Sequence, residues 1–189
     1  MPGIAQPRLN HRATVEALLF IGQRLEAARK APDLHNLGHL LYLAERMHLE
    51  EYGKPISGER YHALEYGPTP THTYDALKVL AGREPFNDPP QDFLQAIGEA
   101  FAHVDGPRFK PLRAADLRRL SQSAVSCLES VLSRGAEWGF DALTGESHDA
   151  AYLAIRERRP NAAMPIEEIA KTLRDGDALV DYLRNPHKG

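Results

Sequence analysis

One amphipathic segment in the first third of the chain restricts the fold more than any other feature. Its apolar residues recur at Leu34, Leu37, Leu40, Leu41, Ala44 and Met47. This i, i+3, i+4, i+7 spacing places them on one face of an α-helix. Asp33 stands where it can cap the amino end, and Gly53 stands where a helix can end in a left-handed residue without steric cost. The pattern therefore predicts a long helix with one buried stripe.

The remaining patterns predict further helices and little strand. Apolar spacing and capping residues indicate helices over residues 14–30, 70–82, 89–104, 122–132, 139–147, 148–158, 165–173 and 177–184. Thr69 is the expected cap of the helix that begins at Pro70. Short runs at residues 60–66 and 108–112 have strand chemistry and can pair with each other. We predict a mainly α protein, a compact single-domain helical bundle with a small antiparallel β element of one hairpin-like pair at most.

Composition and charge exclude several classes of protein. The chain has 189 residues, enough for one domain, and its net charge of −3 argues against non-specific nucleic-acid binding. Its one cysteine, Cys127, excludes an intrachain disulfide, fits a reducing compartment and is expected to be a buried thiol. The sequence has neither the apolar run of a membrane span nor that of a signal peptide. The expected location is the cytoplasm, and no membrane partner is predicted.

The residues offer little catalytic chemistry. His35 and His39 are four apart on a predicted helix and can supply two zinc ligands, with His148 as a third. However, the sequence contains no HExxH, paired-cysteine, nucleophile-elbow or glycine-rich phosphate motif. We therefore predict no enzyme activity, no metal and no cofactor. A metal-dependent enzyme using His35, His39 and His148 is kept as the alternative.

The middle of the chain is rich in carboxylates. They are Glu45, Glu50, Glu51, Glu59, Glu65 and Asp75. Most stand beside other charged residues at helix-surface positions, which favours a solvated helical face over an acid–base pair.

Tyrosines surround a turn that prolines stiffen, between Tyr66 and Pro70. Tyrosine rings beside a rigid turn give a large contact area at low entropic cost, which suits a recognition surface. The same residues are also compatible with a turn whose tyrosines pack on neighbouring helices. From the residues alone, both interpretations stay open.

Residues 40–70 resemble the core signature of the Panacea-domain proteins, the SocA-like antitoxins. The resemblance includes the family's tyrosine-glycine-proline-x-proline turn, here residues 66–70, and the helix that follows it. Leu120 and Ser121 resemble the family's leucine-serine helix start, and residues 143–149 resemble its leucine-x-x-x-(Ser/Thr)-His-(Asp/Glu) segment. Family members often have a tryptophan shortly after that histidine, whereas this chain has Tyr152.

The resemblance implies both a fold and a role. Domains of this family are mostly helical with a small β element, and their best-known members neutralise toxins encoded beside them by direct protein contact. One described mode delivers the toxin to a protease. Since the resemblance extends over residues 13–155, we predict a loose N-terminal segment at 1–12, a Panacea domain at 13–158 and a C-terminal helical extension at 159–189.

The resulting functional prediction is an antitoxin of a type II toxin–antitoxin system in a bacterium. Its partner is a protein toxin from an adjacent gene, with a protease as a second candidate partner; no nucleic acid is expected, and homo-oligomerisation stays open. The alternative within the family is a phage-encoded or stand-alone regulatory binding protein. The candidate partner-binding residues are Tyr61, Tyr66, Gly67, Pro68, Pro70, Tyr74 and His148. The region from Arg156 onward is a second candidate surface.

Overall fold

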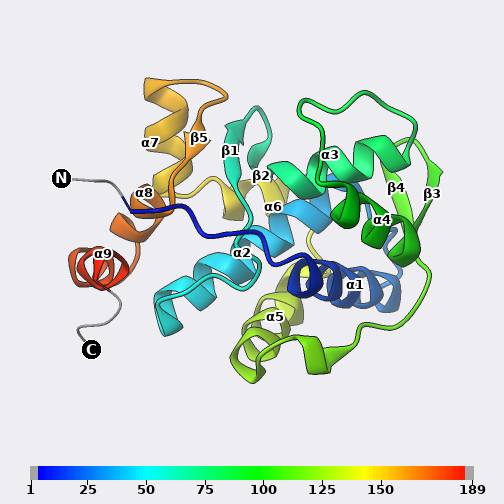
Figure 1. Ribbon diagram of the computed structural model, residues 1–189, viewed down its shortest axis with the longest axis horizontal. Coiled ribbons are helices and arrows are strands. Elements are labelled where there is room, and N and C mark those ends of the chain that lie inside the picture. Colours follow the sequence, from blue (N-terminus) through cyan, green and yellow to red (C-terminus); the bar gives the residue numbers. More distant parts are fainter. Residues whose placement is uncertain (1–3, 186–189) are drawn as a thin grey trace.

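The long amphipathic helix expected from the sequence is α2, Leu34–Tyr52, which runs through the middle of the molecule (Figure 1). The computed structural model describes residues 4–185. A reciprocal pair of hydrogen bonds starts the helix: the Asn36 N–H donates to the Asp33 carboxylate and the Asp33 N–H to the Asn36 side chain, both at 2.7 Å. Gly53 ends it in the left-handed conformation, with φ 67°. Both predicted ends are therefore confirmed.

The described residues form nine α-helices, one 3₁₀ turn and five short strands. The other helices are α1 (His11–Ala27), α3 (Thr71–Leu80), α4 (Gln91–Ala100), α5 (Gln122–Gly135), α6 (Phe140–Ser147), α7 (Ala150–Arg158), α8 (Ile166–Lys171) and α9 (Gly176–Arg184). The strands are β1 (Tyr61–Leu64), β2 (Gly67–Pro70), β3 (Phe101–Asp105), β4 (Arg108–Pro111) and β5 (Ala163–Met164), and the 3₁₀ turn is Leu117–Arg119. The prediction of a mainly α fold is confirmed.

The predicted β content was too small. Strands β2, β1 and β5 form an antiparallel sheet in that order, and β3 pairs with β4 in a separate hairpin. Residues 67–70, expected to stop the first strand, form its partner, and residues 108–111 pair with β3 instead of the first strand. Prolines at 68 and 70 are compatible with β2 because it lies at the edge of its sheet.

The predicted helix over residues 89–104 was also too long. It ends at Ala100, and Phe101 begins β3 with an extended backbone, φ −133° and ψ 147°. The rings of Phe101 and Phe109, on paired strands, are both about 1% exposed and lie in the main core. Burying two phenylalanines on the hairpin outweighs the helical spacing of the sequence, since full burial of such a side chain stabilises the fold by about 1.5–3 kcal/mol.

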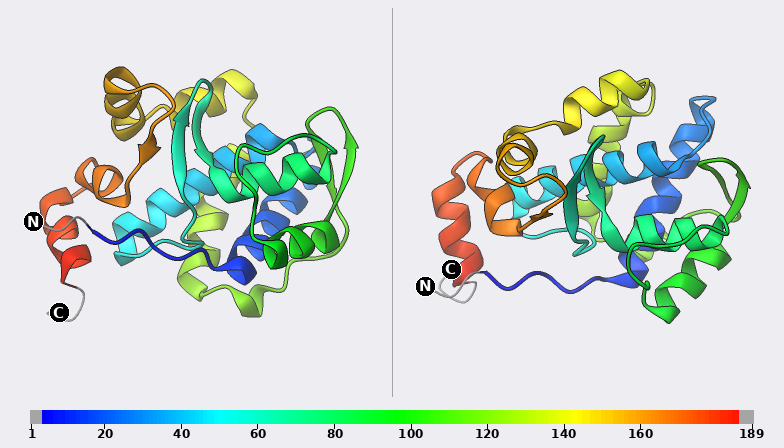
Figure 2. Two further views of the ribbon diagram at one scale, coloured as in Figure 1. Left: turned by 45° about the horizontal axis from the view of Figure 1, so that its top comes forward. Right: turned by 90° about the horizontal axis from the view of Figure 1, so that it is seen from above.

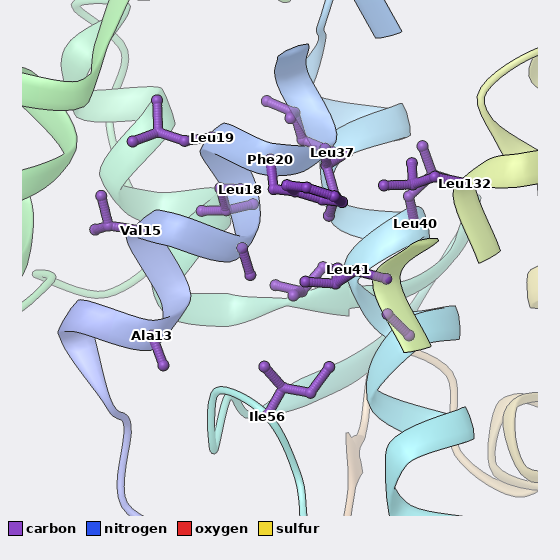
Figure 3. Close-up of a cluster of buried hydrophobic side chains, with 14 of the residues drawn as sticks. Ala13, Val15, Leu18, Leu19, Phe20, Leu37, Leu40, Leu41, Ile56 and Leu132 are labelled. Carbon is purple, nitrogen blue, oxygen red and sulfur yellow. The ribbon is translucent and has the colours of Figure 1, made fainter. Parts of the chain in front are cut away.

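Two hydrophobic clusters lie on different sides of α2. The first is formed chiefly by α1, α2, α4, α5 and the β3–β4 hairpin, and Figure 3 shows side chains converging there, among them Phe20, Leu41 and Leu132. The second joins β1, β5 and α7 to α9 with Tyr42 and Leu49 of α2. The elements α7 to α9 gather at one end of the molecule, beside the N-terminal segment (Figures 1 and 2). The prediction of one buried stripe was therefore wrong: α2 is buried on more than one face.

Three of the carboxylates interpreted as a solvated face are buried instead. Glu45, Glu59 and Asp75 are 5%, 6% and 1% exposed. Glu45 accepts hydrogen bonds from the N–H groups of Ile56 (2.6 Å) and Ser57 (2.7 Å), which fixes the loop after α2. Burial raises the pKa of the Glu45 carboxyl to about 7.

Glu59 performs the capping expected from Thr69. Helix α3 has Pro70 as its N-cap residue, which has no side-chain donor or acceptor. The Glu59 carboxylate instead accepts from the N–H groups of His72 (3.1 Å) and Thr73 (3.0 Å), and from the Thr73 hydroxyl at 2.9 Å. A carboxylate 11 residues before the proline-led helix thus satisfies first-turn N–H groups that would otherwise be unpaired.

The structure also bears on three further expectations, for Cys127, for membrane-spanning helices and for the N-terminal segment. Cys127 is buried, as predicted, and burial raises the pKa of its thiol to about 11. Between residues 4 and 185, none of the helices has the length and apolar character needed to cross a bilayer. Of the predicted loose segment 1–12, residues 4–10 have no regular secondary structure, and residues 1–3 lie outside the described part.

Candidate functional site

A groove of about 720 Å³ opens beside the amino-terminal half of α2. Its other walls come from the β1–β2 hairpin, α3, the loop after α3 and the start of α6. The hairpin and that loop rise from the same side of the molecule (Figure 1). Four aromatic rings line it: Tyr66, Tyr74, Phe86 and Phe140. We call this surface the aromatic groove.

Three of the four rings of the aromatic groove are unusually exposed for their type. Tyr66, Phe86 and Phe140 are 56%, 66% and 52% exposed. The rings form two clusters, with Phe140 against Tyr66 and His35 at centroid distances of 5.7 and 4.1 Å, and Tyr74 stacked on Phe86 at 5.8 Å. Contiguous exposed apolar surface of this kind marks interaction sites on monomeric proteins.

A pair of neutral histidines lies beneath the Tyr66–Phe140 cluster. The facing nitrogens of His39 (Nδ1) and His35 (Nε2) are 3.1 Å apart, and His35 Nε2 is 3.2 Å from the Thr144 hydroxyl. Burial lowers the pKa of His35 to about 4 and that of His39 to about 3. At neutral pH both rings are uncharged, so the floor of the groove adds no positive charge to it.

His39→Gln is expected to remove part of the acid sensitivity of the fold. The folded-state pKa of His39 lies below the ordinary value of 6.5, so the stability it contributes is present above pH 6.5 and is lost as the pH falls toward 3. Between pH 7 and about 4.5, the wild-type protein should lose about 2–3 kcal/mol more of its unfolding free energy than the variant does. Urea denaturation at both pH values measures the difference. Parallel pH profiles of the two proteins would contradict the assignment.

His148 does not complete a metal site with these histidines. Within residues 4–185, no group of three or more histidine, cysteine, aspartate or glutamate side chains is arranged to hold a metal ion. The nearest nitrogens of His35 and His39 point at each other at hydrogen-bonding distance, instead of at a common third point. The arrangement required by the metal-dependent alternative is therefore not formed by the described residues.

The structure brings together some of the candidate partner-binding residues and separates others. Tyr66, Pro70 and Tyr74 line the aromatic groove. Gly67 and Pro68 lie beside them in β2 and are buried. Tyr61 is only 5% exposed and packs against Tyr42 in the second hydrophobic cluster, with ring centroids 5.0 Å apart.

His148 and its neighbours connect the groove to the C-terminal elements. The His148 ring is partly buried and stacks on Tyr152 at 4.3 Å, while its Nε2 has no hydrogen-bond partner in the described part of the chain. The hydroxyl of Tyr152 donates to the Leu64 carbonyl at 2.7 Å. Asp149 caps α7 through the Tyr152 N–H (2.9 Å) and accepts from the Tyr42 hydroxyl (2.6 Å). This segment holds the α6–α7 junction against the hairpin and α2.

Several groove residues were missing from the sequence-based candidates, among them Phe86, Phe140 and His35, the last considered only as a metal ligand. Phe86 stands in a loop of prolines and acidic residues, which is itself a signal because an aromatic side chain in such a loop has little local reason to be there. The Asp75 carboxylate holds this loop by accepting from the N–H groups of Phe86 (2.8 Å) and Asn87 (3.1 Å). Phe140 has no comparable local signal, since it opens an ordinary helix.

Gly67→Ala is expected to destabilise the protein by about 1 to 3 kcal/mol. Gly67 has φ +129°, a region that side chains avoid, and a Cβ there would lie 3.0 Å from His39 Nε2 and 3.1 Å from the Ser147 hydroxyl. Chemical denaturation measures the loss. The matched control is Gly98→Ala, in the exposed face of α4 with nothing within 4 Å, where alanine should stabilise the helix by about 1 kcal/mol. Equal effects at both sites would show that the geometry at Gly67 is not restrictive.

Comparison with known proteins adds one match. A family model described as "Antitoxin SocA-like, Panacea domain" matches residues 37–152, from within α2 to within α7. No curated protein and no solved structure was found to match the chain. The matched residues are more than half of the chain and contain the β1–β2 hairpin, α3 and α6, which form most of the groove. The chain therefore belongs to the family of SocA-like antitoxin proteins that carry a Panacea domain.

Proposed function

We propose that this protein is an antitoxin that neutralises a cognate protein toxin by binding it directly in the cytoplasm, as part of a type II toxin–antitoxin system. The family match over residues 37–152 carries this proposal. The exposed rings of the aromatic groove support it independently, because exposed apolar surface of this kind is typical of interaction sites.

The aromatic groove is the proposed centre of the toxin-binding surface. Tyr66, Tyr74, Phe86 and Phe140 are its anchors, since tyrosine and other aromatic side chains are enriched at interface positions that dominate affinity. A stable complex buries about 1,200–2,000 Å² in total, so the toxin must also contact surface around the groove. Gly67, Pro68, Pro70 and His148 serve mainly to shape this surface. Tyr61, buried in the second cluster, is not part of it.

Co-expression with the product of the adjacent gene tests the proposal. The neighbour alone should arrest growth, and co-expression of this chain should restore it, with a complex recovered by size-exclusion chromatography. A harmless neighbour, or one that stays toxic when both proteins are present, would refute the antitoxin role.

The same cells separate two modes of neutralisation. If the antitoxin acts by occlusion, the toxin should persist at an undiminished level, bound to this chain, while growth recovers. If the antitoxin also acts as an adaptor for proteolysis, toxin should disappear when both proteins are present and reappear when cellular proteases are inhibited. Immunoblotting of the toxin after translation is stopped distinguishes these outcomes.

A further inference from the structure

The free edge of the β1–β2 hairpin, which is β2, is unsuited to binding an extended strand. Along an antiparallel strand, the backbone N–H and C=O groups of successive residues point alternately to one edge of the strand and to the other. The Thr71 N–H donates inward to the Arg60 carbonyl at 2.7 Å, so Thr69 and Gly67, which share its alternation, also point toward β1. The outward positions are then Pro68 and Pro70, which have no N–H group. A partner strand would find no donors along this edge.

The exposure of the rim also argues against a small-molecule pocket. Such pockets enclose most of their ligand's surface. In the aromatic groove, Phe86 and Phe140 are each more than half exposed before anything binds. An open groove with aromatic rings on both walls can accommodate an amphipathic helix between them. Such a helix inserts apolar side chains at i, i+3, i+4 and i+7 spacing. Leu34 and Leu64 continue the apolar lining.

The two aromatic clusters carry charges of opposite sign that lack an ion-pair partner. Glu65 lines the groove next to Tyr66 in the hairpin loop, is exposed, and forms no ion pair with any residue in 4–185. The ammonium of Lys78 lies 4.1 Å from the Phe86 ring centroid and 5.6 Å from that of Tyr74, and it too has no carboxylate within ion-pair distance among the described residues. Asp33, the other carboxylate in the lining, is engaged as the cap of α2.

We propose that the aromatic groove receives an amphipathic α-helix of the toxin, with a lysine or arginine beside Glu65 and a carboxylate beside Lys78. The inference rests on the proposed antitoxin function and adds to it the kind of segment recognised and its direction. The apolar face of the helix contacts Phe140, Tyr66, Tyr74 and Phe86, and the flanking charges fix its orientation. Charges at an interface rim act mainly through orientation and association rate, so each should contribute modestly compared with the rings.

Charge reversal at Glu65 and at Lys78 tests the proposed orientation of the toxin helix. With the purified product of the adjacent gene as the probe, Glu65→Lys and Lys78→Glu should each weaken binding about three- to tenfold and change its salt dependence. Reversing one basic residue of the toxin helix should restore binding to Glu65→Lys and not to Lys78→Glu. Arg83→Glu is the matched control, because Arg83 is exposed and, unlike Lys78, is not placed over the Tyr74 or Phe86 ring; it should leave affinity within about twofold.

Photocross-linking identifies the bound segment. With p-benzoylphenylalanine in place of Phe86, mass spectrometry should locate the cross-link in a helical stretch of the toxin that has apolar residues at helical spacing. A cross-link to an extended or irregular segment overturns the inference, as do charge reversals that leave affinity unchanged while the wild-type chain neutralises the toxin; in both cases the antitoxin role stands. If the wild-type chain does not neutralise the neighbour, the proposed function fails and the helix inference fails with it.

Discussion

Replacing both Tyr66 and Phe140 by alanine is expected to weaken toxin binding about a thousandfold and to abolish neutralisation. Interface aromatics of this kind cost about 2 kcal/mol or more each when truncated, and 1.4 kcal/mol is a factor of ten. The centroids of the two rings are 5.7 Å apart, so their contributions to the binding free energy will not be strictly additive. Isothermal titration calorimetry with the purified toxin measures the change, and co-expression measures its consequence for growth.

Two controls separate this result from a loss of folding and from an alternative surface. The exposed fractions of Tyr66 and Phe140 imply that the double variant should unfold within about 1 kcal/mol of the wild type. Leu117→Ala removes a side chain that is 43% exposed and lies outside the groove, and should bind normally. Tyr182→Ala tests the C-terminal region, where α9 leaves a ring 44% exposed. A loss of binding in Tyr182→Ala but not in the double variant would move the interface to the surface around α9.

Local signals explain why most helices could be predicted. Helix α2 was found because its apolar spacing, the Asp33 cap and the Gly53 end all lie within the segment itself. The same is true of α5, where the Ser121 hydroxyl accepts from the Ala124 N–H at 3.1 Å. Features encoded within one turn or one period of the chain can be read without knowing the fold.

One missed strand, β5, depends on a contact between distant parts of the chain. β5 is only two residues long and exists because Met164 and Ala163 pair with Tyr61 and His62, about a hundred residues earlier. A strand of this length has no recognisable pattern of its own. The cap from Glu59 to α3 was missed for a similar reason, because a proline-led helix usually satisfies its first turn with neighbouring residues.

Alternate side chains of β1 lie on opposite faces of the sheet, and only one of these faces belongs to the candidate site. Neighbouring residues in a strand point to opposite faces. In β1, Tyr61 and Ala63 enter the second hydrophobic cluster, while His62 and Leu64 line the groove. The sequence predicts a short strand followed by a proline-stiffened turn, and it does not assign the faces of that strand, so Tyr61 is grouped with Tyr66 among the candidate residues. The covered face is the one that packs against the residues of α7 to α9 in the second hydrophobic cluster.

Glu59→Ala is expected to lower the free energy of unfolding by about 3 to 5 kcal/mol, because it leaves several buried donors without a partner at once. The Glu59 side chain is fully buried, and its carboxylate accepts from two backbone N–H groups of α3, the Thr73 hydroxyl and the His72 ring nitrogen at 2.7 Å. Urea denaturation measures the loss. Glu84→Ala, in the exposed loop after α3, is the matched control and should change stability by no more than about 0.5 kcal/mol.

Glu59→Gln distinguishes the capping role from simple filling of space. The amide has nearly the volume of the carboxylate but retains one acceptor oxygen, and it turns an NH₂ group toward donors that cannot accept from it. The Glu59→Gln variant should therefore be less stable than the wild type and more stable than Glu59→Ala. Both variants should lose more of the free energy of unfolding than the loss of packing alone predicts. Helix α3 carries Tyr74 and also Asp75, which holds the Phe86 loop. Loss of the hydrogen bonds from Glu59 to the first turn of α3 should therefore weaken toxin binding as well. A stable Glu59→Ala variant with normal binding would show that the cap is dispensable and that the groove is positioned by the hairpin and α2 alone.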